Sequence, residues 1–233
     1  MIRSLSAVLL IFCMTPALAG ECVVLLHGLA RVSNSMLELE SKLNRAGYRV
    51  ENIQYPSRKQ SVSDLAVFAI GKGVTQCREY DAEQIHFVAH SLGGILVRQY
   101  LTEHKLPELG RVVMLGTPNQ GAVIVDRLQG WPGFALLGPS AREIGTGPHS
   151  IIPTLEQVDF ELGVIAGDVS INPLGFVLLG EDSDSVVTVE STRVESMAGH
   201  LVLPVIHNIM MRDDAVIDNA IHFLKTGKFI PRD

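Results

Sequence analysis

The chain has 233 residues, of which 47% are hydrophobic and 6% aromatic, and its formal net charge at pH 7 is −6. This length suits one domain with a sizeable hydrophobic core, rich in the Val, Leu and Ile that suit buried parallel strands. A mildly acidic chain without a basic run offers no electrostatic surface to nucleic acid, so we expect no nucleic-acid partner.

Residues 1–19 have the pattern of a secretory signal peptide. Arg3 supplies the positive charge, residues 7–14 are apolar, and Ala17-Leu18-Ala19 fits a cleavage site. The apolar run is short for a membrane span, which makes an uncleaved N-terminal anchor the weaker alternative. We expect cleavage after Ala19 and a mature, secreted or periplasmic protein in which residues 20–233 form one domain.

The first part of the mature chain alternates between predicted strands and helices. Buried strands are predicted over residues 22–27, 48–55, 85–88 and 111–116. A capping box at Ser35 and Glu38 begins the first helix, which Gly47 ends. Further helices are predicted over residues 61–79 and directly after Ser91. This alternation predicts an α/β fold, with a mostly parallel sheet and helices on both faces.

The second part is less regular. Residues 119–155 form an insertion that is rich in Gly and Pro and has no clean period, so it is either a small lid or an ordinary connection. Strands are predicted over residues 162–167 and 201–206, separated by a long connection that contains an apolar run at residues 176–179. Asp213 or Asp214 caps a final helix that Gly227 ends.

Two cysteines, Cys22 and Cys77, remain after the predicted cleavage. In an oxidising compartment such a pair suggests a disulfide. Cys22 opens the first core strand, and Cys77 lies on the apolar stripe of the helix over residues 61–79. We therefore predict a Cys22–Cys77 disulfide, with two buried free thiols as the alternative.

The residues around Ser91 resemble a nucleophile elbow. An apolar strand leads into the sequence Ala89-His-Ser-Leu-Gly-Gly94, and an apolar helical pattern leads out of it. A sharp strand-to-helix turn tolerates only small residues two positions either side of the serine. It exposes the serine hydroxyl at a helix N-terminus, where negative charge is favoured. Ser91 is the candidate nucleophile.

A serine nucleophile needs a histidine base, and the base works best when a carboxylate orients it. In an α/β-hydrolase arrangement both follow the serine in the order acid, then histidine. His207 follows the last predicted strand directly and is the candidate base, with His200 as the alternative. Asp184 is the candidate acid because Asp184-Ser-Val-Val resembles an acid turn, while Asp168 and Asp182 stay open as alternatives.

The oxyanion hole needs two backbone N–H groups aimed at the developing charge. Leu92, the residue after the nucleophile, is expected to supply one. The turn after the first core strand should supply the other, from Leu29 or, as the alternative, Ala30. His27 is expected to hold this turn by a hydrogen bond.

These motifs together resemble the α/β-hydrolase superfamily, and within it the bacterial lipases and carboxylesterases. The likeness extends to the lipase-like group that includes the GPI inositol-deacylase domain. It rests on residues 24–29, on Phe87-Val-Ala-His-Ser-Leu-Gly-Gly94, on Gly116-Thr-Pro-Asn119, on residues 184–187 and on His207. The resemblance implies a serine hydrolase with Ser91, Asp184 and His207 as its triad, with Leu29 and Leu92 as oxyanion donors and with Gly116-Thr-Pro-Asn119 lining the pocket. Ala89, at the usual place of a glycine, departs from the common pattern.

The predicted function is hydrolysis of carboxylic esters, with a small-molecule or lipid-like acyl ester as substrate and no metal or cofactor. Transient contact with a membrane surface is compatible with such a substrate. Two other functions remain open: acyl transfer through the same triad, and a hydrolase fold kept as a binding module.

Overall fold

A six-stranded sheet forms the centre of the computed structural model, which describes residues 20–171, 179 and 182–231. The strands run in the order β2-β1-β3-β4-β5-β6, and every neighbouring pair is parallel. Their bounds are Glu21–Leu26 (β1), Arg49–Ile53 (β2), Gln84–His90 (β3), Leu109–Leu115 (β4), Leu162–Gly167 (β5) and Gly199–Leu203 (β6). The predicted parallel α/β fold is confirmed.

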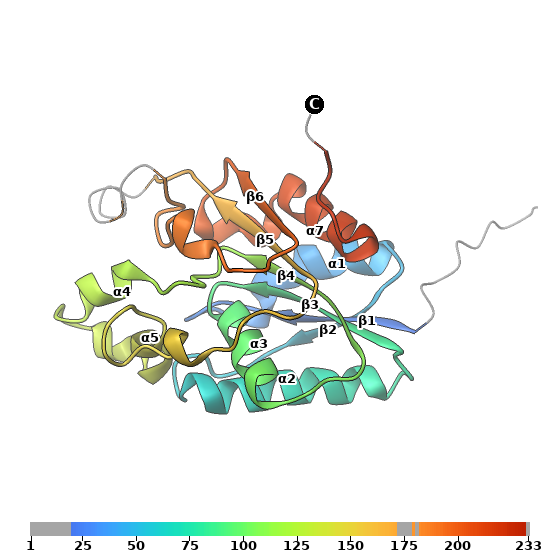
Figure 1. Ribbon diagram of the computed structural model, residues 1–233, viewed down its shortest axis with the longest axis horizontal. Helices are drawn as coiled ribbons and strands as arrows, with labels where there is room; N and C mark the ends of the chain where they lie inside the picture. Colours follow the sequence, from blue (N-terminus) through green and yellow to red (C-terminus); the bar gives the residue numbers. More distant parts are fainter. Residues whose placement is uncertain (1–19, 172–178, 180–181, 232–233) are drawn as a thin grey trace, which may run out of the picture.

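Helices cover both faces of this sheet (Figure 1). One face carries α2 (Val62–Arg78) and α3 (Leu92–Glu103), and the other carries α1 (Leu37–Arg45) and α7 (Asp214–Thr226). Since successive strand residues point to opposite faces, the sheet divides the apolar core in two. Val24 and Phe87 pack in one cluster, whereas Val23 and Val88 pack in the other.

Local sequence signals account for three of the helix ends. The Ser61 hydroxyl caps α2 by accepting a hydrogen bond from the Asp64 N–H, and Asp213 caps α7 in the same way through the Val216 N–H. Gly227 ends α7 with φ of 73°, a left-handed conformation that costs glycine little.

Two sequence predictions about element bounds were wrong. No capping box forms at Ser35, because residues 33–36 form a 3-10 turn and the Ser35 hydroxyl donates to the Val32 carbonyl. The last strand ends at Leu203 rather than at residue 206, since Pro204 has no N–H for the strand ladder. Residues 207–212 then form a 3-10 turn, η5, which begins at His207 itself.

The segment over residues 119–155 contains short helical pieces. They are α4 (Val123–Leu128), η2 (Phe134–Leu137), α5 (Pro139–Glu143) and η3 (Ile152–Thr154), and they lie together beside the sheet (Figure 1). The predicted signal peptide over residues 1–19 lies outside the described residues, as does most of the apolar run at residues 176–179. Among the described residues, no helix has the length and apolarity that crossing a membrane requires.

A disulfide joins Cys22 on β1 to Cys77 on α2, as predicted, with the two Cα atoms 5.8 Å apart. It closes a loop of 55 residues. Both cysteines are completely buried in the cluster between the sheet and α2. The bridge therefore holds the start of the first strand against the end of this helix.

Candidate active site

Ser91 occupies the sharp turn between β3 and α3. Its backbone has φ of 53° and ψ of −120°, a strained conformation for a residue with a side chain. The Ser91 N–H donates to the Leu115 carbonyl of β4, which fixes the turn against the neighbouring strand. The hydroxyl is thereby placed at the N-terminus of α3, where the helix dipole favours a negative charge.

The small residues of the elbow are explained by close backbone approach. A Cβ on Gly93 would lie 2.8 Å from the carbonyl oxygen of Leu26, and one on Gly94 would press on the Thr117 side chain. Thr117 in turn donates its hydroxyl to the Ser91 carbonyl at 3.1 Å. Helix α3 can therefore begin directly on top of β1 and β4 only because both positions lack a side chain.

His207 and Asp184 form a buried pair next to this turn. The His207 Nδ1 lies 2.7 Å from Oδ2 of Asp184, and the His207 N–H donates to the Asp184 carbonyl at 3.0 Å. Gly116 packs against both side chains, since a Cβ there would lie 3.0 Å from His207 Nδ1 and 3.1 Å from Asp184 Oδ2. A glycine at this strand end is what lets the pair approach the sheet.

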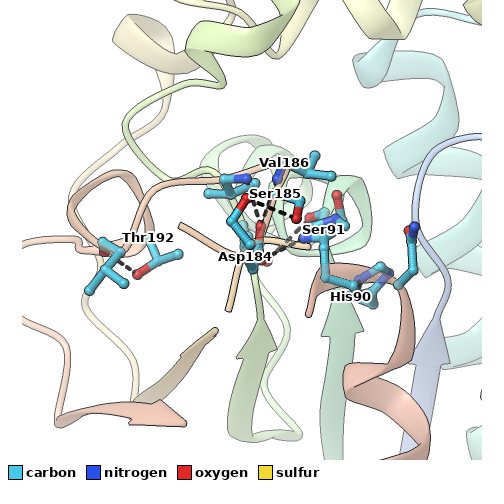
Figure 2. Close-up of polar contacts among 12 residues, drawn as sticks. His90, Ser91, Asp184, Ser185, Val186 and Thr192 are labelled. Atoms are coloured by element: carbon cyan, nitrogen blue, oxygen red, sulfur yellow. Dashed lines mark hydrogen bonds and ion pairs between the residues drawn. The ribbon is translucent and has the colours of Figure 1, made fainter. Parts of the chain in front are cut away.

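A local turn holds the Asp184 carboxylate. Its Oδ1 accepts from the backbone N–H groups of Val186 at 3.0 Å and Val187 at 2.7 Å, which leaves Oδ2 for the histidine. Figure 2 shows Asp184, Ser185 and Val186 gathered at Ser91, with Thr192 set apart. Asp168 and Asp182, the other two candidate acids, are exposed and make no contact with His207.

Ser91 and His207 line one pocket of about 400 Å³. Because Nδ1 of His207 binds Asp184, Nε2 is the ring nitrogen that can exchange a proton with the serine. Among the described residues Ser91 makes no hydrogen bond to His207. Such a contact often shortens only when substrate is bound. His200, the other candidate base, lies outside the pocket lining, with its Nε2 2.8 Å from the Thr192 hydroxyl.

The turn after β1 lies at the same pocket. Leu29 and Ala30 line it, and Ala30 has φ of 56°. The Ala30 N–H donates to the Ser57 hydroxyl at 3.0 Å, so this donor is already in use and Leu29 is left as the candidate oxyanion donor of the turn. Leu92 follows the serine as the first residue of α3, where a backbone N–H has no partner within the helix.

Sequence reasoning predicted that His27 supports this turn, but it missed Tyr55 and Ser57. The His27 ring stacks on Tyr55 with centroids 4.0 Å apart, and the Tyr55 hydroxyl donates to the His27 carbonyl. Burial lowers the pKa of His27, so the ring is neutral, and its Nδ1 lies 2.9 Å from the Gly28 carbonyl. Tyr55 and Ser57 flank Pro56 after β2, a location that carries no recognisable catalytic signal.

His90 connects the elbow to the histidine of the pair. Its Nε2 lies 3.0 Å from the His207 carbonyl, and the two ring centroids are 4.6 Å apart. Burial, together with the nearby His207 and Arg31, lowers the pKa of His90 well below its ordinary value. His90 is therefore neutral and donates from Nε2, an arrangement that fixes the backbone of His207.

The pocket is apolar over most of its surface. Of the Gly116-Thr-Pro-Asn119 motif, Pro118 belongs to its lining. The segment over residues 119–155 supplies the largest apolar share, namely Ala122, Ile124, Val125, Leu128, Phe134, Leu137 and Ile144. Within the described part of the chain, no group of three or more His, Cys, Asp or Glu could hold a metal ion.

Solved structures with a similar fold include lipases and esterases. A lipase from Bacillus licheniformis in its mature form is 19% identical, with 93% of this chain and 95% of that chain covered and a TM-score of 0.75. A phospholipase from Legionella pneumophila is 17% identical, with 87% and 56% covered and a TM-score of 0.67. A metagenomic carboxyl esterase is 16% identical, with 82% and 65% covered and a TM-score of 0.62. No curated protein sequence matches the chain.

The parallel sheet, the serine elbow and these likenesses show the α/β-hydrolase fold that the sequence predicted. A family model gives the closer assignment. The model for palmitoyl protein thioesterase matches residues 22–146, more than half of the chain. The chain belongs to the palmitoyl protein thioesterase family.

Proposed function

We propose that this enzyme hydrolyses fatty acyl esters or thioesters through a Ser91–His207–Asp184 triad and an acyl-enzyme intermediate. The observation that carries the proposal is the Asp184–His207 pair, because its histidine lines the same apolar pocket as the strained Ser91. The apolar lining supports an acyl chain as the bound group. Membership of a palmitoyl protein thioesterase family supports a thioester as one form of the substrate.

The proposed mechanism has two stages. His207 Nε2 takes the Ser91 proton as the serine oxygen attacks the carbonyl carbon, and the N–H groups of Leu29 and Leu92 stabilise the oxyanion. His207 then gives the proton to the departing alcohol or thiol. Water, deprotonated by His207, attacks the acyl-enzyme, and the fatty acid leaves as Ser91 regains its proton. Asp184 stabilises the imidazolium in both stages.

The decisive experiment is labelling with a fluorophosphonate, which forms a covalent bond only with an activated serine. We expect the wild type to be labelled and Ser91→Ala to be neither labelled nor able to hydrolyse esters, with an unchanged melting temperature. Ser41→Ala, on the outside of α1, is the matched control and should behave as the wild type. An unlabelled wild type, or full hydrolysis by Ser91→Ala, would overturn the triad.

The form of the substrate requires a second comparison. The kcat/KM values of one enzyme preparation are measured for oxygen esters and thioesters that carry the same acyl chains, in a series of increasing chain length. The apolar pocket supports higher kcat/KM for longer chains, up to the length that fills it. An added alcohol acceptor distinguishes hydrolysis from acyl transfer, because transfer would yield a new ester instead of the free acid.

We also propose that the protein is exported and cleaved after Ala19. The signal-like sequence of residues 1–19 and the Cys22–Cys77 disulfide support an oxidising compartment. Expression with the full N-terminus should yield a periplasmic or secreted protein. Its intact mass should correspond to a chain that begins at Gly20. A cytoplasmic product that retains residues 1–19 would contradict this location.

A further inference from the structure

The pocket that contains Ser91 has one permanently charged residue among the described residues of its lining, Arg31. All the others are apolar, small or neutral, apart from the two histidines His90 and His207. Arg31 lies two residues after Leu29 in the turn that follows β1. A guanidinium in this position is unexpected for a pocket that only binds an acyl chain, because placing a charge against apolar surface costs hydration free energy.

No carboxylate of the described chain forms an ion pair with Arg31. Its Nη2 donates to the neutral Asn208 side chain, with 2.5 Å between Nη2 and Oδ1. Arg78, Arg111 and Arg193 behave differently, since each pairs with a glutamate. A guanidinium carries five N–H donors in a planar fork that matches phosphate or carboxylate oxygens. Within the described part of the chain, Arg31 thus keeps most of its donors and its whole charge for another group.

The position of Arg31 indicates which part of a substrate it meets. His207 must protonate the leaving group, so the leaving oxygen or sulfur has to lie next to the His207 ring. Asn208 is the next residue, and it holds the Arg31 guanidinium on this side of the pocket. The acyl chain, in contrast, has the apolar surface of residues 122–144 available. The charge therefore lies beside the leaving group.

We propose that Arg31 is a specificity-determining residue that binds a phosphate on the leaving group, with Asn208 orienting the guanidinium. This inference rests on the proposed function and extends it to a substrate class: fatty acyl esters of alcohols that carry a phosphate close to the ester. A guanidinium–phosphate contact can be bidentate, which adds geometric selection to the attraction between charges. An acyl ester of the same alcohol without phosphate has no partner for Arg31.

The test uses pairs of substrates in which only one member carries a phosphate. A short-chain monoacylglycerol is compared with its 3-phosphate, both dissolved as monomers. Short-chain phosphatidylglycerol is compared with the matching diacylglycerol, both in neutral detergent micelles. The monomeric pair reports a soluble phosphate ester, and the micellar pair reports a lipid headgroup. The kcat/KM values of wild type, Arg31→Gln and Arg31→Lys are measured, and Arg45→Gln on the outside of α1 controls for the lost charge.

We expect Arg31→Gln to lower kcat/KM for the phosphate member of a pair by roughly 10- to 100-fold, the range for a hydrogen bond to a charged group. The neutral member should change by less than about twofold, because it carries no anionic group for the guanidinium and the backbone of the turn is unaltered. Arg31→Lys should regain part of the loss as a point charge. Inorganic phosphate should inhibit the wild type more strongly than Arg31→Gln.

Two results would overturn the inference. An equal loss of kcat/KM for both members of a pair would show that Arg31 supports the oxyanion turn instead of binding phosphate. Unchanged kcat/KM for both phosphate substrates would show that Arg31 has no part in substrate recognition. Both results leave the triad intact, provided that neutral esters are still hydrolysed and Ser91→Ala is inactive. Hydrolysis of neutral esters by Ser91→Ala would instead contradict the proposed function.

Discussion

Asp184 shows how much a single carboxylate depends on its surroundings. Asp168, Asp182 and Asp184 all follow strand β5 in sequence, but only Asp184 is buried and directed at His207. The difference arises from the Asp184-Ser-Val-Val turn, whose two N–H groups fix one carboxylate oxygen. An exposed carboxylate has no comparable reason to keep one orientation.

We expect Asp184→Asn to reduce kcat on the order of 10³- to 10⁴-fold while the protein stays folded. An amide can still accept from Val186 and Val187 through its oxygen. Its NH₂ group then faces His207 Nδ1 and forces the tautomer in which Nε2 carries the proton and cannot accept one. Steady-state kinetics on a short ester measure the loss, with Asp168→Asn and Asp182→Asn as controls expected near wild-type activity. A larger loss in either control than in Asp184→Asn would reassign the acid.

The chemistry of His90 and His207 likewise depends on their hydrogen-bond partners. Both are buried histidines of the same pocket, yet their hydrogen bonds give them different chemistry. His207 has a carboxylate at Nδ1, which stabilises an imidazolium. His90 has a backbone carbonyl at Nε2 and no partner at Nδ1, so it stays neutral. Only His207 has the partner that a catalytic base needs.

The elbow between β3 and α3 is the element on which the site depends. Helix α3 begins so close to β1 that the Gly93 position has no room for a side chain. The strained Ser91 backbone persists because packing on both sides holds it. As a result of this sharp turn, the serine hydroxyl projects away from the sheet, where substrate can reach it.

Two glycine-to-alanine changes test this explanation with opposite expected signs. Gly93→Ala should lower the free energy of unfolding by roughly 1 to 3 kcal/mol, because the new methyl meets the backbone of Leu26. Gly71→Ala, within α2 and with no atom within 4 Å of the new Cβ, should raise it by about 1 kcal/mol through helix propensity. Urea unfolding monitored by circular dichroism measures both. Equal shifts would show that packing at the elbow is not limiting.

The region over residues 119–155 illustrates a limit of element prediction. Its short helical pieces, α4 and α5, have six and five residues, too few to present a clear hydrophobic period. The whole segment nevertheless supplies seven of the apolar residues that line the pocket, and three of these, Ile124, Val125 and Leu128, belong to α4. The composition indicated a segment rich in Gly and Pro, whereas the contacts that make it one wall of the pocket come from distant parts of the chain.

At the scale of the whole molecule, burial of histidines couples folding to pH. Burial lowers the pKa of His27, His86 and His90, because it disfavours the charged imidazolium. In the unfolded chain these groups take up protons below about pH 6.5. The unfolded state therefore binds more protons than the native state in this range, and stability falls as pH decreases.

We expect the melting temperature to be steady between about pH 7.5 and 8 and to fall as the pH is lowered from about 6.5 to 5. Each such histidine contributes up to about 1.4 kcal/mol per pH unit until the pH reaches its native pKa. His90→Gln keeps a donor for the His207 carbonyl and should flatten the decline, whereas His149→Gln at an exposed position should not. Calorimetry across this range measures both slopes. The same slope in wild type and His90→Gln would refute the assignment of this pH dependence to His90.

The sequence by itself determined the parallel α/β architecture, since alternating buried strands and amphipathic helices have few other ways to bury their apolar faces. It also determined the elbow, because a strand, a serine between small residues and a helix are adjacent in the chain. The Cys22–Cys77 disulfide could be predicted because only two cysteines follow the expected cleavage site and both occupy apolar positions. Each of these features is local in sequence, or is fixed by a pattern that repeats along it.

Only the tertiary structure shows which of the candidates that lie far apart in the chain come together. Asp184 meets His207, His200 turns to Thr192, and Ala30 donates to Ser57, which leaves Leu29 at the turn. Arg31 and Asn208, separated by 177 residues, meet at the pocket and showed no pattern in the sequence. Hydrogen bonds between distant residues depend on how the strand ends come together in space, and no local periodicity carries this information.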